Sequence, residues 1–247
     1  MSTDPVWPSG VAKVVLPETD STMAEAQRRL GDLAGPTWIL ALRQTAGRGR
    51  RGRAWQDPQG NFAATLIRKT DEPPARLALR SFVAALALHD ALADLTRLPE
   101  AFALKWPNDV LLNGGKLSGI LLESHGPGIL SLGIGVNLHS APERDPEAAF
   151  PPVSLRQETG LVIRPEQLLD RLAPAYETWD ERLRTYGFDP IRTGFLRHVA
   201  RLGEPLVART LKDEFHGTFD GIDDNGALIL ATAEGRRAIP AADIFFP

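Results

Sequence analysis

The sequence predicts an α+β fold, in which a mixed, mainly antiparallel sheet packs with helices and a small β-barrel follows at the C-terminus. Three observations predict this class. Residues 75–97 repeat apolar side chains with a period near 3.6, residues 102–138 hold short apolar segments between turn signals, and residues 203–247 alternate with a period of two. We therefore divide the chain into a larger domain, residues 1–202, and a β-barrel domain, residues 203–247.

The first part of the chain predicts three strands and one helix. Strands are expected at residues 11–16, 38–43 and 62–67, because each is a short and largely apolar run. A helix is expected from residue 22 to about residue 30. Thr22, with Glu25 three residues later, has the pattern of a capping box at its start.

The middle of the chain predicts a buried helix and then an antiparallel meander. The helix, residues 75–97, is rich in alanine and ends before Pro99. Asn113-Gly114 is a strong signal for a two-residue hairpin turn. The strands of the meander are expected at residues 102–104, 110–112, 116–123 and 128–138.

The last third predicts a loop, two helices and the strands of the barrel. Residues 141–153 are rich in proline, alanine and acidic side chains and are expected to form a loop, and helices are expected at residues 166–186 and 190–200. The period-two segments of the barrel cover residues 205–210, 215–222, 227–232 and 236–239.

Composition excludes several classes of function. The formal net charge is −3, whereas a general nucleic-acid binder is usually basic over a whole face. The chain has no cysteine, which excludes disulfides and thiolate chemistry, and its five histidines show no metal-ligand spacing. The N-terminal segment lacks the features of a signal peptide, and no run is long and apolar enough to span a bilayer. These features favour a cytoplasmic enzyme or binding protein.

Residues 47–53 contain four arginines, three glycines and no other residue type. Glycine loses more conformational freedom on ordering than any other residue, so we expect this loop to be mobile until an anionic ligand orders it. Arginine carries a planar fork of donors that suits phosphate and carboxylate groups. The residues alone leave four interpretations open: a phosphate clamp, nucleic-acid binding, a localisation signal and a solvated turn. The position between two apolar strands favours the clamp.

Trp55, directly after this loop, has two interpretations of equal weight. A lone tryptophan is usually part of a core. It can also stack against a base or purine ring once the loop has folded.

Residues 105–109, Lys-Trp-Pro-Asn-Asp, form a second candidate site. Pro107 restricts its own backbone and that of the residue before it, so the turn is expected to be rigid. Lys105 can neutralise a phosphate, and Asp109 can hold Mg²⁺ or orient an amine. The plainer alternative is a surface turn with a salt bridge. Lys116 follows across the hairpin, and we expect both lysines to point into one cleft.

Two lysines, several arginines and an aspartate around one pocket are what nucleotide activation of an acid requires. In that reaction a carboxylate attacks the α-phosphate of ATP in line and pyrophosphate leaves. The protein mainly positions the reactants and stabilises charge, and no nucleophilic side chain is needed.

Five motifs together resemble those of biotin protein ligases in their order and spacing, although each alone is weak. The resemblance extends from about residue 11 to the C-terminus. It implies a fold like that of class II aminoacyl-tRNA synthetases and of biotin and lipoyl ligases, with an SH3-like C-terminal barrel. The motifs are Asp20-Ser21-Thr22, residues 44–53 with Trp55, residues 105–109, residues 116–121 and residues 133–137.

The resemblance implies a two-step enzyme. Biotin and MgATP give biotinyl-5′-AMP, and a specific lysine of the biotin carboxyl carrier protein of a carboxylase then accepts the biotin. It implies no metal site beyond the Mg²⁺ that ATP carries, no nucleic-acid or membrane partner, and a monomer or homodimer.

The resemblance also assigns side chains to the substrates. Lys105, Arg50 and Lys116 are the implied catalytic residues. Trp55 and Asn137 are placed near the adenine, and Ser21, Thr22 and Gln44 near the ureido end of biotin. The implied biotin-binding set is Ser21, Thr22, Met23, Gln44, Arg48, Gly49, Arg50 and Lys116. The implied set for ATP and the adenylate is Arg48, Arg50, Arg53, Trp55, Lys105, Asn108, Asp109, Lys116 and Asn137.

Two departures from the family pattern stand out. Met23 occupies a position at which the family usually has asparagine. About ten residues precede the first expected strand, too few for the helix-turn-helix domain of some members. We therefore expect a ligase without a DNA-binding half.

Three other functions compete with this one. A lipoate ligase or octanoyltransferase shares the general fold, but the arginine loop together with residues 105–109 argues against it. A nucleic-acid-binding protein would leave residues 105–109 unexplained. A ligand-sensing corepressor without catalysis is disfavoured by the presence of Lys105 and Lys116.

Overall fold

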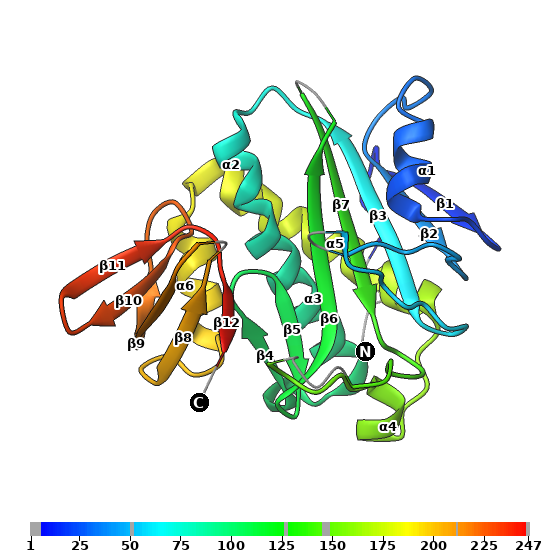
Figure 1. Cartoon of the computed structure of the whole chain (residues 1–247). Helices are drawn as coiled ribbons and strands as arrows, with labels where there is room; N and C mark the ends of the chain where they lie inside the picture. The colour runs from blue at the N-terminus through cyan, green and yellow to red at the C-terminus, as the bar shows by residue number, and fades with distance from the viewer. Residues whose placement is uncertain (1–5, 50–51, 126–127, 145–148, 211, 246–247) are drawn as a thin grey trace.

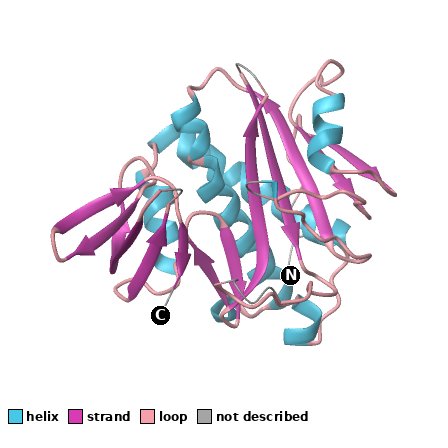
Figure 2. Ribbon diagram, in the orientation of Figure 1, coloured by secondary structure: helices cyan, strands magenta, loops and turns pink. Residues whose placement is uncertain are grey.

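The computed structural model describes residues 6–49, 52–125, 128–144, 149–210 and 212–245, and it confirms the expected α+β fold (Figures 1 and 2). A seven-stranded sheet has the order β1-β2-β3-β7-β6-β5-β4. β1 pairs with β2 in parallel, and all other neighbours are antiparallel. The expected meander is confirmed in β4 to β7. The strands are β1 (Ala12–Leu16), β2 (Thr37–Ala41), β3 (Phe62–Lys69), β4 (Phe102–Lys105), β5 (Asp109–Leu112), β6 (Gly115–Ser124) and β7 (Ile129–Val136).

Helices cover the two faces of this sheet unequally. The long helices α3 and α5 pack against each other and against one face, and α6 joins them (Figure 1). The short helix α1 lies on the other face over β2, β3 and β7, and it leaves the neighbouring part of that face uncovered. The helices are α1 (Thr22–Arg28), α2 (Pro74–Ala78), α3 (Arg80–Thr96), the 3₁₀ turn η2 (Pro99–Ala101), α4 (Leu155–Thr159), α5 (Pro165–Tyr186) and α6 (Asp189–His198). Among those described, none is long and apolar enough to cross a membrane.

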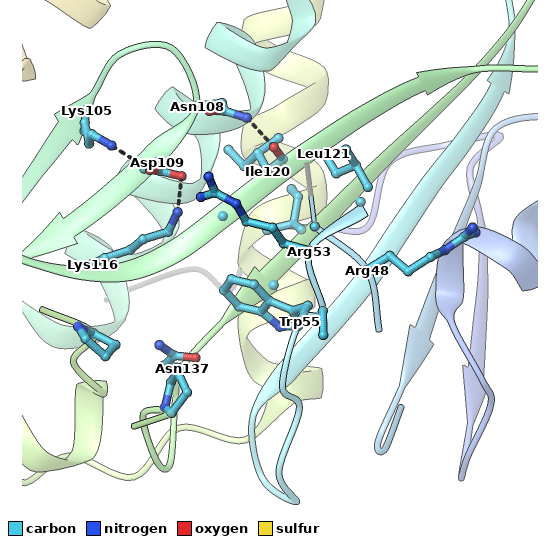
Figure 3. A pocket seen from close by; sticks show the side chains of 18 of the residues that line it. Arg48, Arg53, Trp55, Lys105, Asn108, Asp109, Lys116, Ile120, Leu121 and Asn137 are labelled. Atoms are coloured by element: carbon cyan, nitrogen blue, oxygen red, sulfur yellow. Dashed lines mark hydrogen bonds and ion pairs between the residues drawn. The ribbon is translucent and has the colours of Figure 1, made fainter. Parts of the chain in front are cut away.

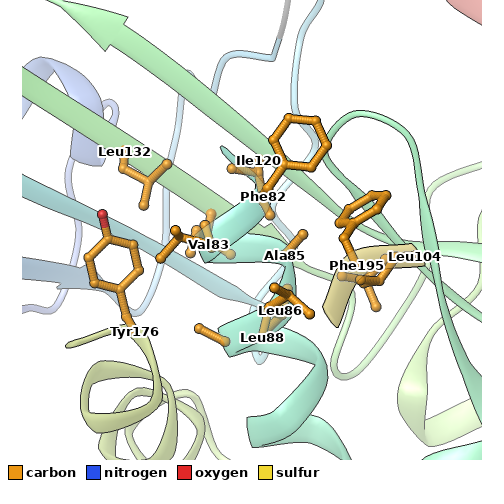
Figure 4. Packing of buried hydrophobic residues seen from close by; sticks show 14 of the residues in the cluster. Phe82, Val83, Ala85, Leu86, Leu88, Leu104, Ile120, Leu132, Tyr176 and Phe195 are labelled. Carbon is orange, nitrogen blue, oxygen red and sulfur yellow. The ribbon is translucent and has the colours of Figure 1, made fainter. Parts of the chain in front are cut away.

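Strand alternation explains why the main core lies on the face of α3 and α5. Successive side chains of a strand point to opposite faces, so Leu132 and Ile134 of β7 point toward α3, and Gly133 between them points away. Figure 4 shows Val83 and Leu86 of α3 packed in this core with Leu132. A smaller cluster on the opposite face joins Ala26 of α1 to Ile39 and Ile67.

The C-terminal part forms a second, five-stranded antiparallel sheet with the order β11-β10-β9-β8-β12. Its strands are β8 (Pro205–Arg209), β9 (Glu214–Ile222), β10 (Leu228–Thr232), β11 (Gly235–Ile239) and β12 (Asp243–Phe245). The sequence did not predict β12, because three residues are too short to show alternation. Phe219 and Leu230 of this sheet belong to the same hydrophobic cluster as α3. The buried indole of Trp106 donates a hydrogen bond of 2.9 Å to the carbonyl of Gly226.

The capping box expected at the start of α1 is wrong. Ser21, not Thr22, is the N-cap residue, and its side chain accepts no capping hydrogen bond. Glu25 pairs with Arg28 and Arg29 within the helix instead of reaching back. The amide of Thr22 donates to the side-chain oxygen of Gln44, 2.8 Å away. A residue distant in sequence thus satisfies the orphan donor of this helix, which no local pattern could reveal.

The single helix expected over residues 75–97 is two helices. The break falls at Leu79, between α2 and α3, where the amides of Leu79 and Phe82 bond to carbonyls three residues back. The tighter turn is of the 3₁₀ type. After it, Arg80 lies fully buried against Asp180 of α5 and Glu72.

A buried ion cluster ties α3 and α5 to the sheet. The carboxylate of Asp180 in α5 is fully buried, 2.9 Å from Arg80 of α3 and 2.7 Å from Arg68 of β3. Arg184, one turn along α5, is 3.2 Å from the same carboxylate. Because a buried charge is costly without its partner, this carboxylate neutralises cations that the core could not otherwise hold.

Asp180→Asn should destabilise the protein by about 3–5 kcal/mol, because the substitution removes the charge that pairs with the largely buried Arg68 and leaves the buried Arg80 with Glu72 alone. Urea unfolding measures the effect. Asp189→Asn is the control, since Asp189 at the start of α6 is exposed and pairs with Arg192 at 2.7 Å, and its loss should cost about 0–1 kcal/mol. Equal losses in the two variants would show that the buried cluster does not carry the stability assigned to it.

Candidate active site

The uncovered part of the sheet forms the floor of a cavity of about 820 Å³. Segments far apart in the sequence build its walls: α1, the described part of the arginine-rich loop, the turn between β4 and β5, residues 142–143 and 149–152, and the end of the C-terminal sheet. Figure 3 shows the side chains at its centre. The cavity is large enough for a small molecule together with a nucleotide, and typical ligand pockets are of this size.

Small residues make the floor. Across one row of the sheet, the strand register places Asp109, Gly119, Gly135 and Ala63 side by side. Gly133 occupies the next such position on β7, opposite Thr65 of β3. Their opposite-facing neighbours are large and form the core, so the same strands fill one face and leave room on the other.

A β-bulge turns Lys116 toward the cavity. The register of β5 and β6 shifts between Val110 and Leu111, which pair with Ser118 and Lys116, so Leu117 is an extra residue in β6. In a regular strand of the same sequence, alternation would place Lys116 on the face of Ser118, which is the core face. With the bulge, Lys116 shares the face of Asp109 and Gly119.

Lys105 and Lys116 meet at one carboxylate. Lys105 Nζ is 3.4 Å from Asp109 Oδ2, and Lys116 Nζ is 2.9 Å from Asp109 Oδ1 (Figure 3). Burial alone would raise the pKa of Asp109, but the charges of Lys116 and Lys105 outweigh it and the pKa is lowered. Burial lowers the pKa of Lys105, and Asp109 opposes that shift. The result is a group of charges with a net positive sign, in which Asp109 and Lys105 are largely buried and Lys116 is partly exposed.

The turn that carries Asp109 is buried rather than a solvated surface turn. Trp106, Asn108 and Asp109 are all buried. Asn108 donates a hydrogen bond from its side-chain amide to the carbonyl of Ile120 in β6 (Figure 3). This contact fixes the turn on the sheet and so fixes the position of Asp109.

The opposite end of the cavity is polar and uncharged. The hydroxyl of Thr22 donates to Gln44 Oε1, 3.1 Å away, and accepts a hydrogen bond of 2.8 Å from Thr65. Ser21 is buried at the start of α1 and lines the same end. These groups can hold a ligand that carries both hydrogen-bond donors and acceptors.

Trp55 and Met23 lie on the glycines of the floor. A Cβ atom at Gly135 would be 2.4 Å from Trp55 Cε2, and one at Gly133 would be 2.9 Å from Met23 Sδ. The half-buried indole of Trp55 lies on the floor of the cavity, where the glycines leave room for it. Trp55 is therefore a residue of the site and not of the core. Met23, where the family pattern has asparagine, supplies an apolar contact.

The described part of the arginine-rich loop is anchored at its base. The amide of Gly49 donates to the carbonyl of Arg53 at 2.7 Å, and that of Trp55 to the carbonyl of Gly47 at 2.9 Å. Figure 3 shows Arg53 extending toward the side of Asp109 and Arg48 extending the other way. Arg53 also lies 3.6 Å from Asp243 of the C-terminal sheet. Arg50, an expected catalytic residue, lies outside the described residues.

Asn137 follows β7 at the edge of the cavity. It is buried, and its side-chain amide donates to the carbonyl of Val153 at 3.1 Å. Its side-chain oxygen is also buried and has no hydrogen-bond partner among the described residues. A buried acceptor in this position suits a ligand that donates a hydrogen bond.

The structure brings every described residue of the expected site to one cavity, and it adds others. Sequence reasoning missed Gly119, Gly133 and Gly135 as site residues, although alternate glycines in an apolar strand are a usable signal of close approach. It also named no site residue in the segment after Asn137 or in the C-terminal sheet, where no local motif marks one. The added lining residues include Phe150, Arg209, Ile244 and Phe245.

Comparisons with known proteins agree with this architecture. Residues 13–139 match the biotin/lipoate A/B protein ligase family, and residues 202–246 match the biotin protein ligase C-terminal domain. The chain belongs to this family of ligases.

Particular relatives cover most of the chain. A biotin–[acetyl-CoA-carboxylase] ligase of Paracoccus denitrificans is 54% identical over 238 residues, which cover 94% of this chain and 99% of that protein. A bifunctional ligase/repressor of Bacillus subtilis is 34% identical over 84% of this chain and 65% of its own length. The structure of an Aquifex aeolicus biotin protein ligase with biotin and ATP superimposes with a TM-score of 0.83 at 25% identity, covering 96% of this chain and 99% of that one.

Gly135→Ala should destabilise the protein by about 1–3 kcal/mol, because the added methyl group collides with the indole of Trp55. The cost should largely vanish in a Trp55→Leu background, which a double-mutant cycle of urea unfolding measures. Gly119→Ala is the control, since its methyl group would approach Trp55 no closer than 3.2 Å and should cost less. An unchanged cost of Gly135→Ala without Trp55 would contradict the contact.

Proposed function

We propose that this chain is an ATP-dependent ligase that activates biotin as biotinyl-5′-AMP and transfers it to a specific lysine of the biotin carboxyl carrier protein of a carboxylase. One observation carries the proposal: a single cavity joins a neutral hydrogen-bonding end at Thr22 and Gln44 to a cationic end at Lys105 and Lys116. A bicyclic urea matches the neutral end, and its carboxylate tail together with a nucleoside triphosphate matches the cationic end.

In this proposal the ureido group of biotin binds at Ser21, Thr22 and Gln44, beside Met23. The valeryl chain crosses the glycine floor toward Lys116. The urea offers both donors and an acceptor to these side chains, whereas the dithiolane ring of lipoate offers no comparable group. A site built from hydrogen-bonding partners rejects a ligand that leaves them unpaired.

The cationic end serves the first chemical step. A biotin carboxylate oxygen attacks the α-phosphorus of ATP, the bond from that phosphorus to the bridging oxygen breaks, and pyrophosphate leaves. Lys116 and Lys105 stabilise the negative charge that the two reactants bring together, and Asp109 holds both ammonium groups in place. Arg48, Gly49 and Arg53, with Arg50, cover the adenylate and limit its hydrolysis.

The nucleotide base is placed by Trp55 and Asn137. The buried side-chain oxygen of Asn137 can accept from the exocyclic amine of adenine. Mg²⁺ arrives with the ATP phosphates, because the two oxygens of Asp109 are already engaged by lysines. In the second step a carrier lysine amine attacks the mixed anhydride, AMP leaves, and the nitrogen loses a proton.

We further propose a catalytic domain of residues 1–202 and a C-terminal domain of residues 203–247, in a cytoplasmic enzyme. Arg209, Asp243 and Phe245 line the cavity from the second domain, so we assign it a part in closing the nucleotide end. Deleting that domain would expose hydrophobic residues of the core that the two domains share. Point variants at the cavity therefore test its role in closing the nucleotide end more cleanly.

The decisive assay combines the protein, labelled biotin, MgATP and a carrier domain. Label on a carrier lysine, with pyrophosphate and AMP formed in equal amounts, is the expected result. Lipoate and octanoate in place of biotin should give little product. Adenylation of lipoate in preference to biotin would refute the proposed substrate, and pyrophosphate release without carrier labelling would refute the transfer step.

Lys116→Met and Lys105→Met should each lower kcat/KM for carrier biotinylation by about 10²–10³-fold, because each removes a fixed charge that stabilises the transition state. Pyrophosphate release measures the adenylation step separately. Lys13→Met, which removes a lysine paired with Asp170 outside the cavity, is the matched control and should leave the rate unchanged. Activity retained in both pocket variants would contradict the assigned chemistry.

A further inference from the structure

Asp57 is a buried carboxylate that no step above uses. Its Oδ2 accepts a hydrogen bond of 3.0 Å from the backbone amide of Gln44, a residue at the polar end of the cavity. The side-chain amide of Gln44 also favours the ionised form of this carboxylate. Within the residues that the structure describes, the buried Oδ1 has no hydrogen-bond partner. A buried carboxylate oxygen without a hydrogen bond lowers the stability of the folded protein. Its presence here therefore calls for a functional explanation.

The loop that carries Asp57 is fixed to the rest of the protein. The amide of Asn61 closes a turn on the carbonyl of Pro58 at 3.1 Å. The buried side chain of Asn61 then bonds three backbone groups, accepting from the amides of His139 and Ser140 at 2.9 and 3.1 Å and donating to the carbonyl of Ser140 at 2.8 Å. Asp57 therefore presents its carboxylate to Gln44 from a rigid support.

Gln44 connects Asp57 to the polar end of the cavity. Its Oε1 accepts from both the amide and the hydroxyl of Thr22, at 2.8 and 3.1 Å. Because a backbone amide can only donate, the atom it contacts must be the oxygen, which fixes the orientation of the Gln44 side chain. Gln44 is therefore held at its main chain by Asp57 and at its side chain by Thr22.

Few charged groups face Asp57. A second, more open cavity of about 740 Å³ borders the first at Gln44 and Gln56, and its charged or ionisable lining residues are Arg43, Asp57 and Glu143. Arg43 pairs with Glu18 at 2.9 Å in an exposed position. The ring of His139 packs against Gly60 in the same loop. Burial raises the pKa of Asp57 to about 6, and the hydrogen bonds from Gln44 oppose that rise.

We infer that Asp57 is a positioning residue for Gln44: its carboxylate sets the geometry of the ureido-binding end, and biotin affinity depends on it although it does not touch biotin. The inference rests on the proposed function. It also explains why a carboxylate persists where it lowers stability. The folded protein disfavours the charged form, so stability present when Asp57 is protonated is lost as pH rises through about 6.

The first test measures biotin binding at pH 8 by calorimetry. Asp57→Ala should raise the Kd for biotin about tenfold or more, because it removes a charge-assisted hydrogen bond to Gln44. Asp57→Asn, whose oxygen can still accept from that amide, should stay within about threefold of the wild type. The KM for ATP should change little in either variant. Asp32→Ala, at an exposed aspartate after α1, is the matched control and should bind as the wild type does.

The second test uses pH. As pH falls from 8 to 5, protonation of Asp57 weakens its acceptor oxygen, so the wild-type Kd for biotin should rise below about pH 6 by no more than the roughly threefold difference allowed for Asp57→Asn. Asp57→Asn should abolish this rise, whereas His139→Gln and Glu143→Gln should retain it. Asp57→Asn should also raise Tm at pH 8, and this gain should shrink toward pH 5, where the wild-type group becomes neutral.

The outcomes separate this inference from the proposed function. Wild-type protein that binds biotin, with Asp57→Ala folded and binding equally well, would overturn the positioning role and leave the ligase assignment intact. A pH dependence that survives Asp57→Asn and disappears in His139→Gln would overturn it as well. Failure of the wild type to bind biotin would overturn both. The expected result is that the wild type becomes more stable and binds biotin more weakly as pH falls, and that Asp57→Asn abolishes both changes.

Discussion

The geometry of the pocket depends on strand alternation and on one interruption of it. Along β6 and β7, each side chain that fills the core is followed by one that faces the substrate cavity, so the two faces cannot be changed independently. The extra residue Leu117 breaks this alternation at one place and brings Lys116 to the side of Asp109. A strand without the bulge would bury a lysine in the core and leave the carboxylate with a single cation.

Asp109 has a structural and an electrostatic role that are difficult to separate. It is buried, and its charge is tolerated because two ammonium groups lie within 3.4 Å. The same arrangement keeps both ammonium groups in fixed positions before any substrate arrives. Fixed charges need no reorganisation during the reaction, which is the property that makes such sites effective.

Much of the fold was predictable from the sequence, because its signals are local. The meander from β4 to β7 and the turn at Asn113-Gly114 follow from short apolar runs and from residues that accept positive φ, which the structure shows at both turn positions. The break at Leu79 and the strand β12 were not predictable. The first coincides with a buried pair that Arg80 makes with a helix a hundred residues away, and the second is too short to carry a pattern.

Some residues of the candidate site were also predictable from the sequence, and others were not. Chemically distinctive residues such as Lys105 and Lys116 stood out by type and spacing. Asp57 did not, since an aspartate before a proline looks like an ordinary turn residue, and only its burial beneath Gln44 reveals its connection to the cavity. The glycines of the floor were visible as a motif, but their purpose became clear only when Trp55 was seen to lie on them.

The hydrogen bond from Trp106 to Gly226 has a consequence for the history of the molecule. The indole belongs to the turn that presents the reactive cluster, yet its acceptor lies in the C-terminal sheet, in a buried contact. Neither half can be exchanged for an unrelated module without stranding a polar group in the interior. Genetic recombination that separated the two halves would therefore be selected against, and we expect them to have been inherited as a unit.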